Sequence, residues 1–228
     1  MKMSPKVITG AIGMAAALAL SVSTTQAQNL LADPGFEAAP SQPNPILLPG
    51  GANGGWSATF NGANYTAASA ETGNLGLELT EAAGSQWNFE GAYQVVGGVA
   101  AGQKYTFTED FKAATALSST YGPAFIQLTY FNAAGTDLGT VETGGNGANA
   151  IHFSPTANWA TYSVSATAPA GAIYVAPYVA MMENGSSTTI ETIYADNGTL
   201  TLVPEPSILA LLGMGLGLPF FFLRRRNS

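Results

Sequence analysis

The stretch Tyr105–Phe111, YTFTEDF, alternates apolar and polar residues with the period of two that belongs to a β-strand. Its three aromatic residues share one face, which predicts a strand with one buried side. Neighbouring side chains of a strand point to opposite faces. Glu109 and Asp110 are therefore not expected to converge as a catalytic carboxylate pair.

Short runs of this kind recur along the chain between turns rich in Gly, Asn, Pro and Ser, and no long amphipathic helical pattern interrupts them. Phe125–Phe131 is apolar on both faces, which favours a central strand. Ile173–Met182 contains Pro177, which favours an edge strand or a bulge. Eight or nine such strands predict an all-β jelly-roll sandwich. The other expected strands are Trp56–Phe60, Tyr65–Ala68, Leu75–Leu79, Ala92–Val99, Trp159–Ala168 and Thr192–Val203, and the expected long loops are Ala38–Gly55 and Thr143–Ala150.

The first 27 residues have the layout of a secretory signal peptide. Lys2 and Lys6 precede an apolar segment from about Val7 to Leu20, and small residues lead up to Ala27. This pattern predicts cleavage by signal peptidase after Ala27. The alternative is a membrane helix that stays attached, but the short apolar segment favours cleavage.

The chain ends with a Pro-Glu-Pro motif, an apolar run and three arginines. The apolar run would reach roughly 24 Å as a helix, just short of a hydrocarbon core of about 30 Å. Positive residues stay in the cytoplasm, so the preceding body would lie outside. A buried core helix fits the three arginines poorly. The motif is Pro204, Glu205 and Pro206, the run is Ile208–Leu223, and the arginines are Arg224, Arg225 and Arg226.

These segments divide the chain into a signal peptide (1–27), a body (28–203) and a C-terminal sorting segment with a transmembrane helix (204–228). The body keeps two lysines and 13 acidic residues, which gives it a formal charge of −11, and it has no arginine. A body of this charge is a poor partner for nucleic acid, because such binding needs Lys and Arg at the phosphates.

Nothing in the sequence indicates catalysis. The chain has no cysteine, and its one histidine, His152, has no recognisable serine or acid motif around it. A nucleophile elbow, a zinc-binding H-E-x-x-H helix and a phosphate-binding loop are all absent. We therefore expect a protein that is not an enzyme.

The C-terminal segment, with its three parts in this order behind a signal peptide, resembles the PEP-CTERM sorting signal of exported bacterial proteins. The resemblance implies recognition by an exosortase, a transient anchor in the inner membrane, and cleavage near the motif. It further implies a final place at the cell surface or in the extracellular matrix of a Gram-negative bacterium that makes exopolysaccharide or biofilm.

The body resembles the galactose-binding-like jelly rolls found among carbohydrate-binding modules. Its opening, NLLADPGFE (Asn29–Glu37), is similar to the N-L-x-x-N-x-G-F-E signature of such modules, with Asp33 in place of the asparagine. Further matching pieces follow in the same order. They are AGQKYTFT (Ala101–Thr108), YFNAAGTDLGT (Tyr130–Thr140), WATYSVSATAPAGA (Trp159–Ala172) and YADNGTLT (Tyr194–Thr201).

This resemblance implies one structural calcium ion, held in part by Glu37 and Asp196. Calcium takes six to eight oxygen ligands, from carboxylates, carbonyls and water. Relatives often have paired aspartates where this chain has Asp196 and Asn197. The alternative is that Glu37 caps a turn and Asp196 is a solvated residue at a strand end.

Sugar binding needs exposed aromatic rings with polar groups around them, because a sugar ring has apolar faces and a polar rim. Trp87 has Gln86, Asn88 and Glu90 as neighbours, and Tyr121 and Tyr130 are further candidates, although large aromatic residues of a sandwich mostly pack in its core. We therefore expect a non-catalytic exported protein that binds polysaccharide. The alternative is a structural or adhesive matrix protein without a discrete ligand site.

Overall fold

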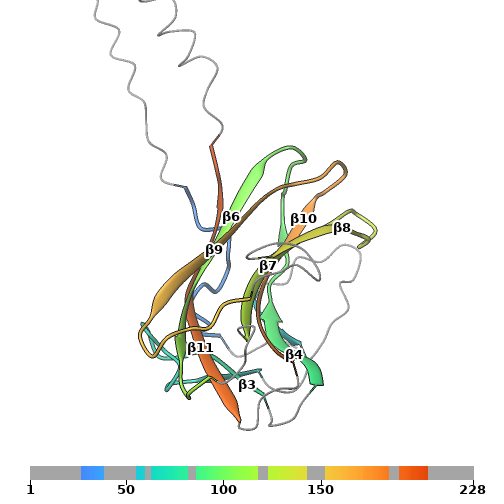
Figure 1. Cartoon of the computed structure of the whole chain (residues 1–228). Coiled ribbons are helices and arrows are strands. Elements are labelled where there is room, and N and C mark those ends of the chain that lie inside the picture. Colours follow the sequence, from blue (N-terminus) through green and yellow to red (C-terminus); the bar gives the residue numbers. More distant parts are fainter. Residues whose placement is uncertain are drawn as a thin grey trace, which may run out of the picture.

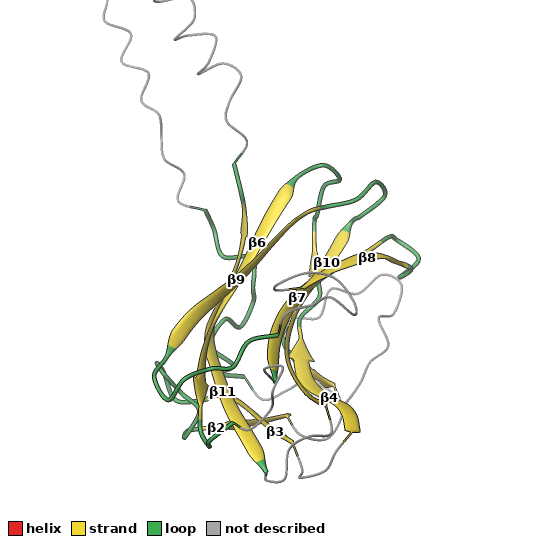
Figure 2. Ribbon diagram, in the orientation of Figure 1, coloured by secondary structure: helices red, strands yellow, loops and turns green. Residues whose placement is uncertain are grey.

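The computed structural model of the chain describes residues 27–38, 55–59, 63–81, 86–117, 123–142, 152–184 and 190–204. Every regular element in these ranges is a strand, and the strands form two antiparallel sheets that pack face to face (Figure 1, Figure 2). Among the same residues no helix is long and apolar enough to cross a membrane. The predicted signal peptide up to Gln26 and the predicted transmembrane helix lie outside the described residues.

The first sheet, here called sheet A, has the strand order β1-β4-β10-β7-β8, and β5 pairs with β10 beside this path. It forms the right-hand layer of the sandwich in Figure 1. Its strands are β1 (Ser57–Thr59), β4 (Gln86–Tyr93), β5 (Val96–Gly97), β7 (Ala124–Phe131), β8 (Asp137–Glu142) and β10 (Tyr174–Asn184).

The second sheet, sheet B, has the strand order β2-β3-β11-β6-β9. Its strands are β2 (Ala63–Thr66), β3 (Gly76–Glu81), β6 (Lys104–Ala113), β9 (Ala160–Thr167) and β11 (Glu191–Leu202). Since consecutive strands of the chain repeatedly alternate between the two sheets, and the two orders interlock as in a double Greek key, the architecture is a jelly roll. The predicted fold class of the body is confirmed.

Most predicted strands are found close to their expected bounds, and the alternation of β6 is as predicted. Its burial pattern places Glu109 on the core face and leaves Asp110 on the outer face. Two strands, β4 and β8, were not predicted as strands of their observed length. Both contain Gly and charged residues that strands generally disfavour.

The prediction that Pro177 lies in an edge strand is wrong, because β10 lies inside sheet A between β4 and β7. The proline is tolerated there for a local reason. On the side that lacks an N–H donor, the neighbouring chain passes from β4 to β5, and the Pro177 carbonyl accepts a single bond from Gln94 N (3.2 Å). The ladder is interrupted where the proline would have had to donate.

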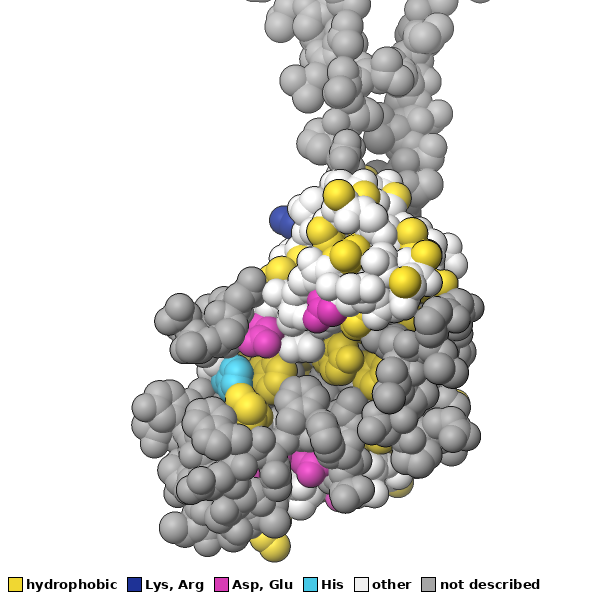
Figure 3. Space-filling model, turned by 90° about the vertical axis from the view of Figure 1, so that its right-hand side faces the viewer, with side chains coloured by type: hydrophobic (Ala, Val, Ile, Leu, Met, Phe, Trp, Pro, Cys, Tyr) yellow, Lys and Arg dark blue, Asp and Glu magenta, His cyan; other side chains and the backbone are white. Residues whose placement is uncertain are grey.

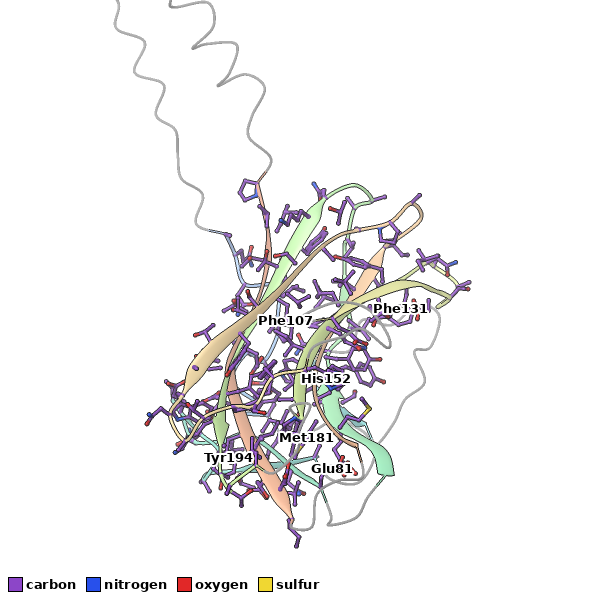
Figure 4. The ribbon with its side chains drawn as sticks, viewed as in Figure 1. Glu81, Phe107, Phe131, His152, Met181 and Tyr194 are labelled. Carbon is purple, nitrogen blue, oxygen red and sulfur yellow. The ribbon has the colours of Figure 1, made fainter. Side chains whose placement is uncertain are left out.

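The core between the sheets is built from the inward residues of both, including Phe107, Ile126, Leu128, Met181 and Leu200. The stick view in Figure 4 shows side chains filling the space between the layers and labels Phe107 and Met181 among them. The segment before β1 also belongs to this core. Its Phe36 is completely buried and stacks on Trp56 with ring centroids 4.6 Å apart.

Candidate functional site

The outer face of sheet A carries a row of four side chains that crosses four strands at one level. Tyr93 of β4 is the register partner of Tyr178 of β10, which faces Gln127 of β7, which in turn faces Glu142 of β8. Since neighbouring strands lie about 4.8 Å apart, the row spans roughly 14 Å. It runs from aromatic rings at one end to an amide and a carboxylate at the other.

The aromatic end of this row is well ordered by packing. Tyr93 and Tyr178 stack with centroids 4.9 Å apart and an angle of 26° between their planes. Ala176 is fully buried beside them, and Phe131 belongs to the same cluster on this side of the sheet. Burial, with smaller contributions from Tyr93 and Asp137, raises the pKa of Tyr178 to about 12, so its hydroxyl stays protonated at neutral pH.

The polar end lies over β7 and β8. Gln127 donates to Thr129 Oγ1 (3.2 Å), and Thr129 and Thr140 share a hydrogen bond of 2.9 Å across the two strands. Burial raises the pKa of the Glu142 carboxyl from its ordinary value. His152 stacks on Phe125 of β7, with ring centroids 4.6 Å apart.

We call this surface the sheet A face. Figure 3 looks onto it and shows hydrophobic side chains in its middle, with acidic side chains and the single histidine beside them. Apolar ring faces next to amide, hydroxyl and carboxylate groups are the combination that matches an amphipathic sugar ring. The sheet A face consists of Tyr93, Phe125, Gln127, Thr129, Phe131, Thr140, Glu142, His152, Ala176 and Tyr178.

The three aromatic residues predicted to contact sugar have different positions. Trp87 lies in β4 of sheet A, but its side chain is not among those described, and Tyr121 lies outside the described residues. Tyr130 is 1% exposed and donates its hydroxyl to Ala166 O (3.1 Å) in the core between the sheets. The prediction for Tyr130 is therefore wrong, because alternation along β7 turns it inward.

Sequence reasoning missed the tyrosine pair and the polar row. Tyr93 and Tyr178 are 85 positions apart in the sequence, and only the pairing of β4 with β10 brings them together. The alternation of β10 around Pro177 was the one available signal, since it places Tyr178 opposite to the buried Val179.

A second cluster lies beside β11, the central strand of sheet B, where Glu37 and Asp196 hold the same loop. Asp196 Oδ2 accepts from the backbone nitrogens of Glu71 (2.8 Å) and Thr72 (2.9 Å). Glu37 Oε1 accepts from those of Asn74 (2.7 Å) and Leu75 (3.2 Å). The structure thus brings the two predicted residues together, as a carboxylate clamp on loop 71–75.

The two acids of the clamp differ in environment. Hydrogen bonds from Asn74 and Leu75 lower the pKa of Glu37, which is exposed. Asp196 is buried, and burial raises its pKa even though three backbone N–H groups oppose that change. The alternative interpretation of Asp196 as a solvated residue is therefore wrong, whereas the capping role suggested for Glu37 is confirmed.

A hollow of about 570 Å³ opens beside the clamp. Carboxylate and carbonyl oxygens of this neighbourhood are the ligand types that calcium takes. Among the described residues no three acidic or histidine side chains surround one point, so an ion here would draw further ligands from carbonyls and water. The hollow is lined by Asn29, Asp33, Pro34, Gly35, Glu37, Thr72, Gly73, Asn74, Asn197, Gly198 and Thr199.

Comparison with known proteins bears on the fold. No protein-family model matches the sequence, and no curated protein does. Among solved structures, the enzymatically active domain of tailspike protein 4 from bacteriophage CBA120 superposes with a TM-score of 0.50 at 10% identity, over 77% of this chain. This chain covers only 21% of that protein's length.

Two carbohydrate-binding modules are also similar, at lower scores. TmCBM61, solved in complex with β-1,4-galactotriose, gives a TM-score of 0.45 at 12% identity and covers 77% of this chain and 99% of its own. A family 16 carbohydrate-binding module gives 0.41 at 16% identity and covers 76% and 97%.

Proposed function

We propose that this protein is an exported, non-catalytic protein that binds polysaccharide through the sheet A face. The observation that carries the proposal is the stacked pair Tyr93–Tyr178, in one row with Gln127 and Glu142, in which Tyr178 is partly exposed and Tyr93 is 3% exposed. Rings and polar groups fixed by sheet register are preorganised, so little side-chain entropy is lost when a sugar chain binds.

Affinity electrophoresis and glycan arrays test this proposal. We expect at least one polysaccharide to retard the protein, and Tyr178→Ala to weaken binding about tenfold or more, since an aromatic anchor at a site contributes on the order of 2 kcal/mol. Trp87→Ala, in β4 of the same sheet, extends the test.

Tyr194→Ala is the matched control, because Tyr194 has similar exposure but lies in β11 of sheet B (Figure 4). It should leave retardation unchanged. If no polysaccharide retards the protein, or if Tyr178→Ala binds as tightly as the wild type does, the sheet A face is not a sugar site.

One feature favours the alternative of a structural matrix protein. The outer face of sheet B carries hydroxyl pairs that bond across its strands, at Thr80–Thr192 (3.1 Å), Thr106–Ser165 (2.7 Å) and Thr108–Thr199 (2.5 Å). A face with hydroxyl pairs of this kind suits contact between copies. Self-association in analytical ultracentrifugation that no sugar changes would favour this alternative over polysaccharide binding.

The proposed route to the cell surface uses the terminal segments. Signal peptidase would cleave after Ala27, and an exosortase of the inner membrane would recognise Pro204, Glu205 and Pro206 and cleave nearby. Mass spectrometry of protein from a host with an exosortase should find a chain that begins at Gln28 and lacks the arginines. In a host without the exosortase, or with Glu205→Ala, the tail should remain; a tail retained in every host would contradict this route.

The proposed cofactor is one structural calcium ion at the carboxylate clamp, with Glu37 and Asp196 as the predicted ligands. The observation in favour is that both carboxylates bind the same loop, that Glu37 lines the hollow, and that Asp196 Oδ1 accepts, among the described residues, a single hydrogen bond from Asn197 N (2.8 Å). Bound only by the folded protein, the ion would raise the midpoint of thermal unfolding. Calcium titration of that midpoint, reversed by EDTA, is the measurement.

A further inference from the structure

The body (28–203) has two basic residues, Lys104 and Lys112, and both lie in β6 of sheet B. The alternation of β6 places them on the outer face of that sheet, because their neighbours Tyr105 and Phe111 are buried in the core. The Nζ atom of Lys112 lies over the Trp159 ring, 5.8 Å from its centroid. Since the two sheets pack face to face (Figure 2), the surface with both lysines points away from the sheet A face.

The strands of sheet A carry charges of one sign. They contain four acidic residues and neither lysine nor arginine. Glu142 ends the row that begins at Tyr93, and Asp137 is the register partner of Phe131 on the same face. The charge of Asp137 also contributes to the raised pKa of Tyr178. The four acids are Glu90 of β4, Asp137 and Glu142 of β8, and Glu183 of β10.

The remaining segments of the body cannot bring a cation to this face. The segments 39–54, 60–62, 82–85, 118–122, 143–151 and 185–189 contain no Lys, Arg, Asp or Glu. The other basic residues of the chain belong to the two terminal segments whose removal is proposed above. The one side chain beside the sheet A face that can carry a positive charge is therefore His152, which stacks on Phe125.

An acidic sugar needs a partner that this face lacks. Uronate, sulfate and phosphate groups are acceptors when ionised, and proteins recognise such groups mainly with Arg and Lys. Beside Glu142 an ionised acid group would meet a second acceptor, so no hydrogen bond could join the two. Two negative charges at such a distance also repel each other.

A neutral sugar fits the same groups. Each sugar hydroxyl both donates and accepts, so it can donate to the Glu142 carboxylate and accept from the Gln127 amide. Thr129 and Thr140, which share a hydrogen bond of 2.9 Å, lie next to this row and add groups of the same kind. The apolar face of a sugar ring can lie on Tyr178. No group of this set requires a charge on the ligand.

We propose that the sheet A face binds uncharged polysaccharide and rejects acidic polysaccharide. The proposal rests on the polysaccharide binding proposed above and names the chemical class of the ligand. It gives the one-sided distribution of charge a function, with Glu142 and Asp137 on the binding face and both lysines on the opposite surface. Chains that carry uronate, sulfate or phosphate groups are excluded from the face.

Affinity electrophoresis at about pH 8, where an unperturbed imidazole is neutral, tests this selectivity with matched pairs of polysaccharides. We expect retardation by at least one neutral polysaccharide, and binding at least about tenfold weaker for its acidic counterpart. Binding of the neutral polysaccharide should change less than about twofold between roughly 0.05 and 0.5 M NaCl, because an uncharged ligand releases no counterions. The pairs are hydroxyethylcellulose with carboxymethylcellulose, dextran with dextran sulfate, and β-1,4-galactan with polygalacturonate.

Glu142→Lys reverses the charge at the polar end of the row. We expect this variant to bind the acidic counterpart at least about tenfold more tightly than the wild type does, and to lose the gain in high salt, which screens the new ion pair. Adding Tyr178→Ala to the variant should remove the gain, because both residues belong to one row.

Glu78→Lys is the matched control. It changes the net charge by the same amount, but Glu78 lies in β3 of sheet B. This variant should bind the acidic polysaccharide as weakly as the wild type does. The comparison separates a charge that acts at the sheet A face from the net charge of the whole body.

The outcomes separate this proposal from the one on which it rests. If an acidic polysaccharide retards the wild type as strongly as its neutral counterpart, and Tyr178→Ala removes that retardation, the face binds sugar but the selectivity is wrong. Retardation that Tyr178→Ala leaves intact arises elsewhere on the chain and agrees with the proposal. An equal gain in Glu142→Lys and Glu78→Lys, or a gain in neither, contradicts it. If no polysaccharide retards the protein, both proposals fail.

Discussion

Gly76→Ala is expected to destabilise the protein by about 3 kcal/mol, the upper end for a single added methyl group. The new Cβ would lie 2.1 Å from the carbonyl oxygen and 2.5 Å from the carbonyl carbon of Ser69, and 2.9 Å from the nitrogen of Ala70. All three are backbone atoms, so no side chain can turn away to make room.

The turn around Ser69 is also unable to move. Ser69 Oγ donates to the carbonyl of Gly76 (2.6 Å), and the carboxylate clamp fixes the following loop at four backbone nitrogens. Urea unfolding followed by far-ultraviolet circular dichroism gives the free energy of unfolding. Gly55→Ala is the control, because a Cβ there would meet no atom within 4 Å, and it should change stability by less than about 0.5 kcal/mol. Equal stability of both variants would show that the turn at Ser69 relaxes.

Phe36→Ala should lower the free energy of unfolding by about 3–5 kcal/mol, as expected for loss of a fully buried aromatic ring. Phe36 has no exposed surface, stacks on Trp56 and meets the ring of Tyr65 edge-on at 5.6 Å. Its loss would leave a cavity that these two rings cannot both fill. The midpoint of thermal unfolding should fall by roughly 6–20 °C, given about 2–4 °C per kcal/mol for a domain of this size.

The experiment also asks whether the opening segment belongs to the cooperative fold. Leu30 pairs its backbone nitrogen with Leu200 O (2.8 Å), but its side chain is 36% exposed. The free energy of unfolding of Leu30→Ala should therefore lie within about 0.5 kcal/mol of that of the wild type. If Phe36→Ala loses less than 1 kcal/mol, the segment before β1 is not a part of the cooperative core.

Local pattern was sufficient for the outline of the fold. The alternation of β6 and the doubly apolar β7 were predicted correctly, because alternation shows which side of a strand is buried whatever its neighbours are. β8 was not recognised, since Gly139 and a register shift next to it interrupt its alternation. The central position of β10 in sheet A depends on which strands pair with it, and the preference of proline for edge strands says nothing about that pairing.

Some residues of the candidate sites could be found from the sequence, and others could be found only from the structure. Glu37 and Asp196 were singled out from the opening signature and the last strand, and in the structure both accept hydrogen bonds from loop 71–75. The prediction for Tyr130 was wrong, because a shift of one residue along a strand moves an aromatic side chain from the surface to the core. The pair Tyr93–Tyr178 was not found, since a pair across two distant strands leaves no local pattern.

The sequence by itself determined the all-β class, the bounds of most strands and the inward direction of Glu109, because these follow from a period of two along a single strand. Only the tertiary structure decided what Glu109 faces. Opposite it in β11 lie Asn197 and Gly198, where the pairing is irregular, and the Leu31 side chain and the Pro34 carbonyl lie beside Gly198, all from segments more than 70 positions away. Strand pairing fixes such neighbours through long-range contacts, and alternation along one strand carries no information about them.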